Sequence, residues 1–369
     1  MSSKDVASKI LAAAGIPLNS SEPWSIQVHN EKLWDRVISQ GGLGFGESYM
    51  DGWWDCDAID VMLTKLLLVD VLKLLKPGPM LALHVARSNL RNNQTKQRAA
   101  ENAKHHYNIG NELYERMLDA EMVYSCGYWA RADSLGAAQE AKFDLICRKL
   151  DLKPGMRLLD IGSGWGGFLR YAVKNYGVHG TGISPADNQI NLAREKSAGL
   201  GIDFIQQDYR DLTGQFDRIV SIGMMEHVGP KNYQTFFSKC DELLTHDGRM
   251  LHHTISSNVT KKATDPFFER YIFPGGVLPS LAQIATAVED VFAIEDVHNF
   301  GPDYDRTLLE WHKNINSKWQ EIPQYDQRFQ RMWNYYLLAS ASGFRSGDLQ
   351  LIQCVFQRVG QRQTYVTSR

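Results

Sequence analysis

The sequence predicts an α/β fold with a mostly parallel sheet, and two observations lead to this expectation. Short apolar runs alternate with helical stretches from about residue 156 onward, a spacing typical of βαβ units. The first run ends in GSGWGG (Gly162–Gly167), where a strand would turn into a helix. Glycine at this density is costly in backbone entropy, so we expect the chain to pass close to a ligand there.

The individual elements are expected in the following order. Residues 1–18 are expected to form a short helix. They are not expected to be a signal peptide, because they lack a continuous apolar core. Two late strands are expected at 291–300 and 349–359, and the second suits an edge strand because it comes near the end of the chain. The five strands of the alternating region are expected to begin at Met156, Val178, Ile202, Phe216 and Arg249.

Changes in composition predict two domains joined by a linker. Residues 1–85 form the predicted N-terminal domain and combine a glycine-rich and aromatic stretch with an amphipathic one. Residues 86–104 are polar, basic and poor in apolar side chains, which favours a linker. Residues 105–369 contain the alternating strands and helices and form the predicted larger domain.

Composition and charge exclude several classes of protein. With 369 residues, 43% of them hydrophobic, and a net charge of −2, the chain reads as a globular protein and not as a general nucleic-acid binder. The five cysteines are scattered without a C-x-x-C pair, which favours a reducing cytoplasm. No run approaches the roughly 18 apolar residues of a spanning helix. The absence of H-E-x-x-H and similar spacings predicts no metal site.

The glycine-dense stretch satisfies the dinucleotide fingerprint, which by itself is a weak signal. A tight turn without any ligand also explains it. A nicotinamide dinucleotide would require an acidic residue near the end of the second strand, about 20 residues further on. That strand ends in GTGIS (Gly180–Ser184), and the first acid after it is Asp187. The sequence therefore disfavours NAD and favours S-adenosylmethionine, which has no pyrophosphate to cradle.

A resemblance to a known family narrows the chemistry. LDIGSGWGG resembles motif I of class I methyltransferases, and further motifs closely resemble the cyclopropane-fatty-acyl-phospholipid synthases and their relatives, the mycolic acid cyclopropane synthases. The resemblance implies a Rossmann-like, seven-stranded, mostly parallel sheet with helices on both faces, plus a smaller N-terminal lipid-docking domain. The motifs that carry it are HHYNIGNELYERMLD (105–119), MVYSCGYW (122–129), GMMEHVGPKNY (223–233), YIFPGGVLPS (271–280) and FGPDYDRTLLEW (300–311).

The resemblance also implies a set of residues that bind S-adenosylmethionine. The glycine loop would lie against the methionine part, Asp208 would hold the adenine amine, and Gln189 would reach the ribose. Core packing is the alternative for the tyrosines, and a solvated charge is the alternative for Asp208. The implied residues are Tyr124, Ser125, Asp160, Gly162, Gly164, Gln189, Asp208 and Tyr209, with His106 and Tyr107 as a lid.

The implied substrate is a cis double bond in a phospholipid acyl chain, and ring closure on it needs a base. An alkene is a poor nucleophile, so the reaction needs an electrophilic methyl donor, a dry site and a group that removes one proton. In this family bicarbonate is that base. Of His252 and His253 only one can face the site, because neighbouring strand residues point to opposite faces. The implied cage is Glu226, His253, Tyr304 and the backbones of Ile255 and Cys126.

A phospholipid substrate implies contact with the inner face of the cell membrane, and the family implies a homodimer. The leucine-rich stretch 61–76, with Lys65, Lys73 and Lys76, is the expected docking surface, and a core or dimer helix explains it equally well. The alternative function is a methyltransferase of this fold acting on another acceptor, such as an alkene without ring closure or an amine. The missing ribose acid disfavours an NAD oxidoreductase, and the intact cofactor motifs disfavour a lipid-binding protein without activity.

Overall fold

The computed structural model describes residues 2–69, 109–261 and 263–369. The chain forms two compact units. The first unit consists of the described residues within 1–92, 262–274 and 304–349, and the second of those within 93–261, 275–303 and 350–369. The predicted linker 86–104, His106 and Tyr107 lie outside the described residues.

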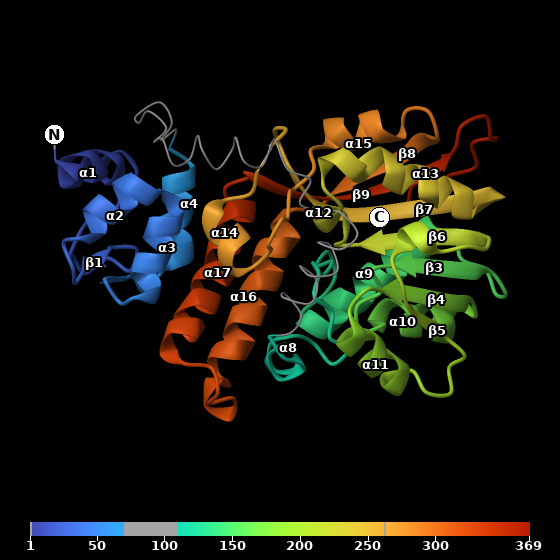
Figure 1. Ribbon diagram of the computed structural model, residues 1–369, viewed down its shortest axis with the longest axis horizontal. Helices are drawn as coiled ribbons and strands as arrows, with labels where there is room; N and C mark the ends of the chain where they lie inside the picture. Colours follow the sequence, from blue (N-terminus) through green and yellow to red (C-terminus); the bar gives the residue numbers. More distant parts are fainter. Residues whose placement is uncertain (1, 70–108, 262) are drawn as a thin grey trace. The chain divides into compact units, whose positions relative to one another are not determined.

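The second unit is built on one seven-stranded sheet, which confirms the predicted α/β fold (Figure 1). Its strand order is β5-β4-β3-β6-β7-β9-β8. The pairs β5/β4, β4/β3, β3/β6 and β6/β7 are parallel, and β9 runs antiparallel to β8. The strands are β3 (Arg157–Ile161), β4 (His179–Ser184), β5 (Asp203–Gln206), β6 (Phe216–Ile222), β7 (Leu244–Ser257), β8 (Phe292–Asn299) and β9 (Leu349–Arg358).

The position of β9 differs from the sequence-based expectation. We expected an edge strand, but β9 lies between β7 and β8, and β8 forms the edge. Residues 351–357 of β9 are all buried, whereas β8 is buried only at Phe292 and Asp296. Order along the chain does not fix order in a sheet; a continuous buried run is what a strand covered on both faces requires.

Helices cover both faces of this sheet, and strand alternation assigns each side chain to one of them. Leu159, Ile219 and Met250 belong to one apolar core, and their neighbours Leu158, Val220 and Leu251 belong to the other. Helices α12 (Met225–Val228), α13 (Tyr233–Leu243) and α15 (Leu281–Val288) contribute to the first core. Helices α9 (Leu135–Lys149), α10 (Gly167–Tyr176) and α11 (Asp187–Lys196) contribute to the second.

The first unit is a helical cluster with an aromatic core. Trp54 stacks on Phe45 with ring centroids 4.4 Å apart, and Tyr335 meets Trp54 edge-on at 6.5 Å. A Cβ on Gly46 would lie 2.4 Å from the Phe267 ring, so the two backbones approach closely there. The core therefore joins segments that are far apart in sequence, and the compact units do not follow the chain as two consecutive segments.

The elements of this first unit come from both ends of the chain. The early ones are α1 (Ser3–Ala13), α2 (Leu33–Gln40), α3 (Gly42–Met50) and α4 (Ile59–Leu67), with the short pair β1 (Gln27–Val28) and β2 (Trp54–Asp55). The late ones are α14 (Pro266–Tyr271), α16 (Pro302–Asn316), η3 (Trp319–Glu321) and α17 (Gln327–Arg345).

Candidate active site

The glycine-dense stretch forms the turn between β3 and α10. Gly162, Gly164 and Gly166 have φ angles of 88°, 53° and 80°, in the left-handed region that favours glycine. A Cβ on Gly166 would also lie 2.6 Å from the ring of Phe204. The turn therefore needs glycine for its backbone conformation and, at Gly166, for space. Residues of this turn line a pocket at the ends of the strands.

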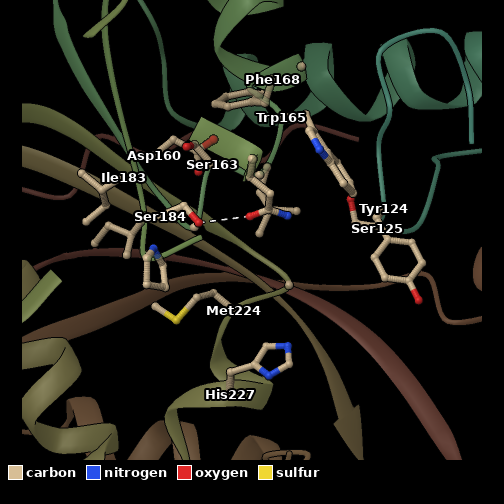
Figure 2. A pocket seen from close by; sticks show the side chains of 18 of the residues that line it. Tyr124, Ser125, Asp160, Ser163, Trp165, Phe168, Ile183, Ser184, Met224 and His227 are labelled. Carbon is tan, nitrogen blue, oxygen red and sulfur yellow. Dashed lines mark hydrogen bonds between the residues drawn. The ribbon is translucent and has the colours of Figure 1, made fainter. Parts of the chain in front are cut away.

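All eight residues predicted to bind the cofactor line one pocket (Figure 2). The pocket lies where strands β3, β4, β5 and β6 end, which is where open α/β sheets place ligands. Figure 2 shows Asp160 and Ser163 on one side of the pocket and Met224 and His227 on the other. Sequence reasoning missed the roles of Met224 and His227 in the lining, although both belong to the GMMEHVG stretch.

Hydrogen bonds within the chain hold several polar side chains of this pocket. The Ser184 hydroxyl donates to Gln189 Oε1 at 3.0 Å. The Asp208 carboxylate accepts from Arg210 Nε at 2.8 Å and from Arg210 Nη2 at 2.9 Å. Both predicted ligand-binding side chains are thus oriented by neighbours before any ligand binds.

A buried lysine that sequence reasoning missed also lines the pocket. Lys142 Nζ, on α9, donates to Ser125 Oγ at 2.8 Å and to Gln139 Oε1 at 2.7 Å. Gln139 Nε2 in turn donates to the Ser125 carbonyl at 2.8 Å. Burial lowers the pKa of Lys142 to about 7. The ammonium, when charged, fixes the loop that carries Ser125.

Asp160, at the end of β3, is the buried acid of this pocket. Burial raises its pKa to about 7, and the nearby Lys142 opposes that rise. Its Oδ1 has no hydrogen-bond partner among the residues that the structure describes. A donor group of a bound ligand would satisfy this oxygen.

A second group of functional side chains, the Glu226 cluster, consists of Glu226, His253, Ile255 and Gln353. Glu226 Oε1 accepts a hydrogen bond from the Ile255 N–H at 2.7 Å. Burial raises the pKa of Glu226 to about 7. Gln353 Nε2 donates to His253 Nδ1 at 3.2 Å. Within the described chain, Glu226 Oε2 and His253 Nε2 have no hydrogen-bond partner although both are buried.

The two neighbouring histidines point to opposite faces of β7, as strand geometry requires. His252 packs among Phe236 and Phe237, with ring centroids 6.1 and 5.9 Å away. His253 instead meets Phe300 at 5.8 Å and bonds to Gln353. The His253 side chain therefore lies on the same face of β7 as that of Ile255, whose backbone N–H holds Glu226.

The other two residues of the predicted cage, Cys126 and Tyr304, belong to different units. Cys126 is buried directly after Ser125, and its thiol donates to the Gly127 carbonyl at 3.1 Å. Tyr304 belongs to the first unit, where its ring stacks on Phe344 at 4.6 Å. Its membership of the cage stays a prediction. No group of three or more His, Cys, Asp or Glu in the described ranges has the geometry of a metal site.

The sheet order and the pocket at its strand ends define a class I S-adenosylmethionine-dependent methyltransferase fold. Two solved structures illustrate this. The cyclopropane synthase MmaA2 from Mycobacterium tuberculosis is 29% identical, with a TM-score of 0.66 over 70% of this chain and 97% of that one. The mycolic acid cyclopropane synthase CmaA1, complexed with SAH and CTAB, is 32% identical, with a TM-score of 0.66 over 70% of this chain and 98% of that one.

Residues 94–354 match the mycolic acid cyclopropane synthetase family, and the chain belongs to this family. A curated relative, the cyclopropane-fatty-acyl-phospholipid synthase of Escherichia coli (strain K12), is 49% identical over 96% of this chain and 93% of its own length. A probable fatty acid methyltransferase of Pseudomonas putida is 35% identical over 71% of this chain and 70% of its own. These matches confirm the predicted resemblance and the enzyme class, and the NAD alternative falls away.

Proposed function

We propose that this enzyme is a cyclopropane-fatty-acyl-phospholipid synthase. It transfers a methylene carbon from S-adenosylmethionine to a cis double bond of an unsaturated phospholipid acyl chain. The observation that carries the proposal is the 49% identity with the Escherichia coli enzyme over 96% of the chain. The cofactor pocket supports it, because the eight predicted binding residues meet there although they come from four parts of the sequence.

The residues of the pocket fit S-adenosylmethionine. The glycine turn lets the backbone approach the ligand closely, and Asp160 Oδ1, with no partner in the described parts of the chain, can accept from an ammonium group. When bound, S-adenosylmethionine supplies a methyl group made electrophilic by its sulfonium. Lys142 and Gln139 hold Ser125, and Arg210 holds Asp208. These contacts orient the donor without taking part in the transfer.

The Glu226 cluster fits bicarbonate as the base. Glu226 Oε2 and His253 Nε2, both without partners among the described residues, can accept from its O–H and donate to its oxygens respectively. When bound, bicarbonate supplies the base that removes a proton from the newly attached methyl group. The Ile255 N–H is engaged by Glu226, so in this chain it positions the carboxylate. The Cys126 backbone, in the same unit as the cluster, is a further proposed member of the cage.

Aromatic side chains surround this cluster and suit a cationic intermediate. The His253 ring meets Phe300 at 5.8 Å, and Tyr128 meets Phe300 edge-on at 5.4 Å. Aromatic faces stabilise a nearby cation by about 0.5–2 kcal/mol. The rings beside His253 therefore support a cationic intermediate in this part of the site.

The proposal extends to the membrane surface, where the substrate lies. No helix in the described residues is both long and apolar enough to cross a membrane. Leu67 and Leu68, at the end of α4, are 46% and 68% exposed, and Lys65 Nζ lies 5.1 Å from the Trp24 ring centroid. We propose that this end of α4 docks on anionic lipid from the cytoplasmic side, and that the enzyme is a homodimer. Lys73 and Lys76 lie outside the described residues.

Vesicle sedimentation tests the docking part of the proposal. Lys65→Glu combined with Leu68→Ser is expected to reduce binding to vesicles of phosphatidylglycerol several-fold, because it removes one apolar contact and inverts one charge. Lys153→Glu, at an exposed position of the second unit, serves as the matched control. Undiminished sedimentation of the double variant would exclude this surface.

Lipid mass spectrometry tests the activity itself. Purified enzyme is incubated with S-adenosylmethionine and vesicles of an unsaturated phospholipid, with and without added bicarbonate. The expected product is heavier by one CH₂ and resists hydrogenation, because its double bond has become a ring. A heavier product that still takes up hydrogen, or one that carries a hydroxyl, would assign the enzyme to another acceptor chemistry of the same fold.

A further inference from the structure

The ring of His253 is neutral at neutral pH. Burial holds its pKa well below its usual value, and the charge of Lys142 lowers it further. Its exposed fraction is 1%. A neutral imidazole carries one N–H, so one ring nitrogen donates and the other accepts. Which nitrogen donates decides what His253 can bind.

Gln353, on the neighbouring strand, contacts the His253 nitrogen that decides the position of the ring proton. Its side chain is fully buried on β9, which lies beside β7 in the sheet. Its amide Nε2 lies 3.2 Å from His253 Nδ1. With its amide in this orientation Gln353 can only donate, which makes Nδ1 the acceptor and puts the ring proton on Nε2; the amide oxygen Oε1 is buried without a partner among the described residues.

On the opposite side of the ring, His253 Nε2 is left without a hydrogen-bond partner in the part of the chain that the structure describes. Neither His253 Nε2 nor Glu226 Oε2 has a partner in the described ranges, and both are buried. The Glu226 carboxylate is anchored at the backbone N–H of Ile255, two residues after His253 on β7. An oxyacid anion with one O–H would satisfy both atoms. With the proton on Nδ1 instead, Nε2 could only accept, and it would compete with Glu226 for the single O–H of that anion.

We infer that Gln353 is a positioning residue: it fixes His253 as the Nε2–H tautomer, so that His253 donates to the anion held with Glu226. The identity of that anion as bicarbonate rests on the proposed function, but the tautomer does not. The hydrogen-bond partner behind a metal-ligating histidine commonly changes affinity or activity by about 10- to 100-fold, and we expect the lower end of that range for a histidine that binds an anion. Gln353 acts only through His253.

The tautomer can be measured directly on the full-length enzyme. Long-range ¹H–¹⁵N spectra of protein labelled with ¹⁵N-histidine at pH 8 distinguish a protonated ring nitrogen from an unprotonated one, and the loss of signals in His253→Asn assigns His253. The wild type is expected to show Nε2 protonated. Gln353→Met, nearly the same size without an N–H, is expected to show a mixture. Nδ1 protonated in the wild type, or an unchanged tautomer in Gln353→Met, overturns the inference.

Gln357→Met is the matched control for fold and packing. Gln357 lies on the same strand, is also buried, and donates to the Arg362 carbonyl at 3.1 Å. Its replacement removes a comparable buried amide without touching His253, so its His253 signals are expected to match those of the wild type. Thermal melting of both variants shows whether either has lost its fold.

Kinetics in carbon dioxide-depleted buffer test the positioning role. The bicarbonate concentration for half-maximal activity is expected to rise about tenfold in Gln353→Met, while KM for S-adenosylmethionine stays within twofold and Gln357→Met matches the wild type. An unchanged bicarbonate requirement in Gln353→Met overturns the positioning role. A wild-type activity that needs no bicarbonate overturns the proposed base instead, and the spectra then still report the tautomer on their own.

Discussion

The cofactor pocket and the Glu226 cluster lie at the same edge of one sheet but differ in how their polar side chains are satisfied. In the pocket, Ser125 is bonded to Lys142 and Asp208 to Arg210, while Asp160 Oδ1 and Ser163 Oγ are buried without partners among the described residues. In the cluster, Glu226 Oε2 and His253 Nε2 are buried without partners among the described residues. Ser125 and Asp208 of the pocket are therefore held by neighbouring side chains before a ligand binds. The cluster carries an unpaired polar cost of about 1–3 kcal/mol per group until something binds there.

Glu226→Gln is expected to have the largest effect, because it changes the cluster and leaves the cofactor pocket untouched. The amide keeps an oxygen for the Ile255 N–H, but its NH₂ cannot accept the O–H of the bound base. Formation of cyclopropane product, followed by lipid mass spectrometry, is expected to fall about 10²- to 10⁴-fold. Binding of S-adenosylmethionine, measured by calorimetry, is expected to stay unchanged. Lost cofactor binding would show that the two regions are one site.

The same variant is also expected to change how the free energy of unfolding depends on pH. The pKa of Glu226 rises from 4.5 in the unfolded chain to about 7, so the folded state favours the protonated form. The associated stability is fully present below pH 4.5 and is lost as the pH rises through 7. Glu226→Gln should therefore leave the free energy of unfolding unchanged near pH 4 and raise it by up to about 3 kcal/mol at pH 8.

Urea denaturation at the two pH values measures this difference. Glu242→Gln is the control, because the side chain of Glu242 is 63% exposed and should show no comparable pH dependence. A Glu226→Gln variant that is no more stable than the wild type at pH 8 would contradict the buried, unpaired carboxylate.

Lys142→Met tests whether the hydrogen bonds of the cofactor pocket position its residues for the ligand. Methionine fills most of the same volume but donates no hydrogen bond, so Ser125 and Gln139 lose their shared partner. KM for S-adenosylmethionine is expected to rise about tenfold, with a loss of about 1–3 kcal/mol in the free energy of unfolding. An unaltered KM would mean that the loop carrying Ser125 is held by other contacts.

Gly182→Ala probes the packing beneath the pocket and should have the smallest effect. A Cβ at Gly182 would lie 2.7 Å from Ser163 Oγ and 2.8 Å from the Leu169 side chain, whereas the nearest atoms to a Cβ at Gly180 are 3.3 Å away. Gly182→Ala is expected to lower the free energy of unfolding by about 1–2 kcal/mol. Gly180→Ala, on the same strand, should cost less in the same thermal or urea experiment.

Local patterns account for what could be predicted about the site. The glycine-dense turn and the alternating strands are read from neighbouring residues, and the motif at Met122–Trp129 brought Tyr124 and Ser125 into the predicted pocket. Lys142 escaped prediction because a lone lysine in an amphipathic helix looks like a solvated charge. Only its bond to Ser125, 17 positions away, reveals that it lines the pocket.

The sequence by itself determined the α/β class, the glycine turn and the chemistry of individual side chains, because these depend on periodicity and on residues close together in the chain. The tertiary structure alone decided that β9 lies inside the sheet and that Gln353 meets His253, 100 positions away. Strand order and side-chain partners across a sheet arise from packing between distant segments. No local pattern encodes which strand becomes the neighbour of which.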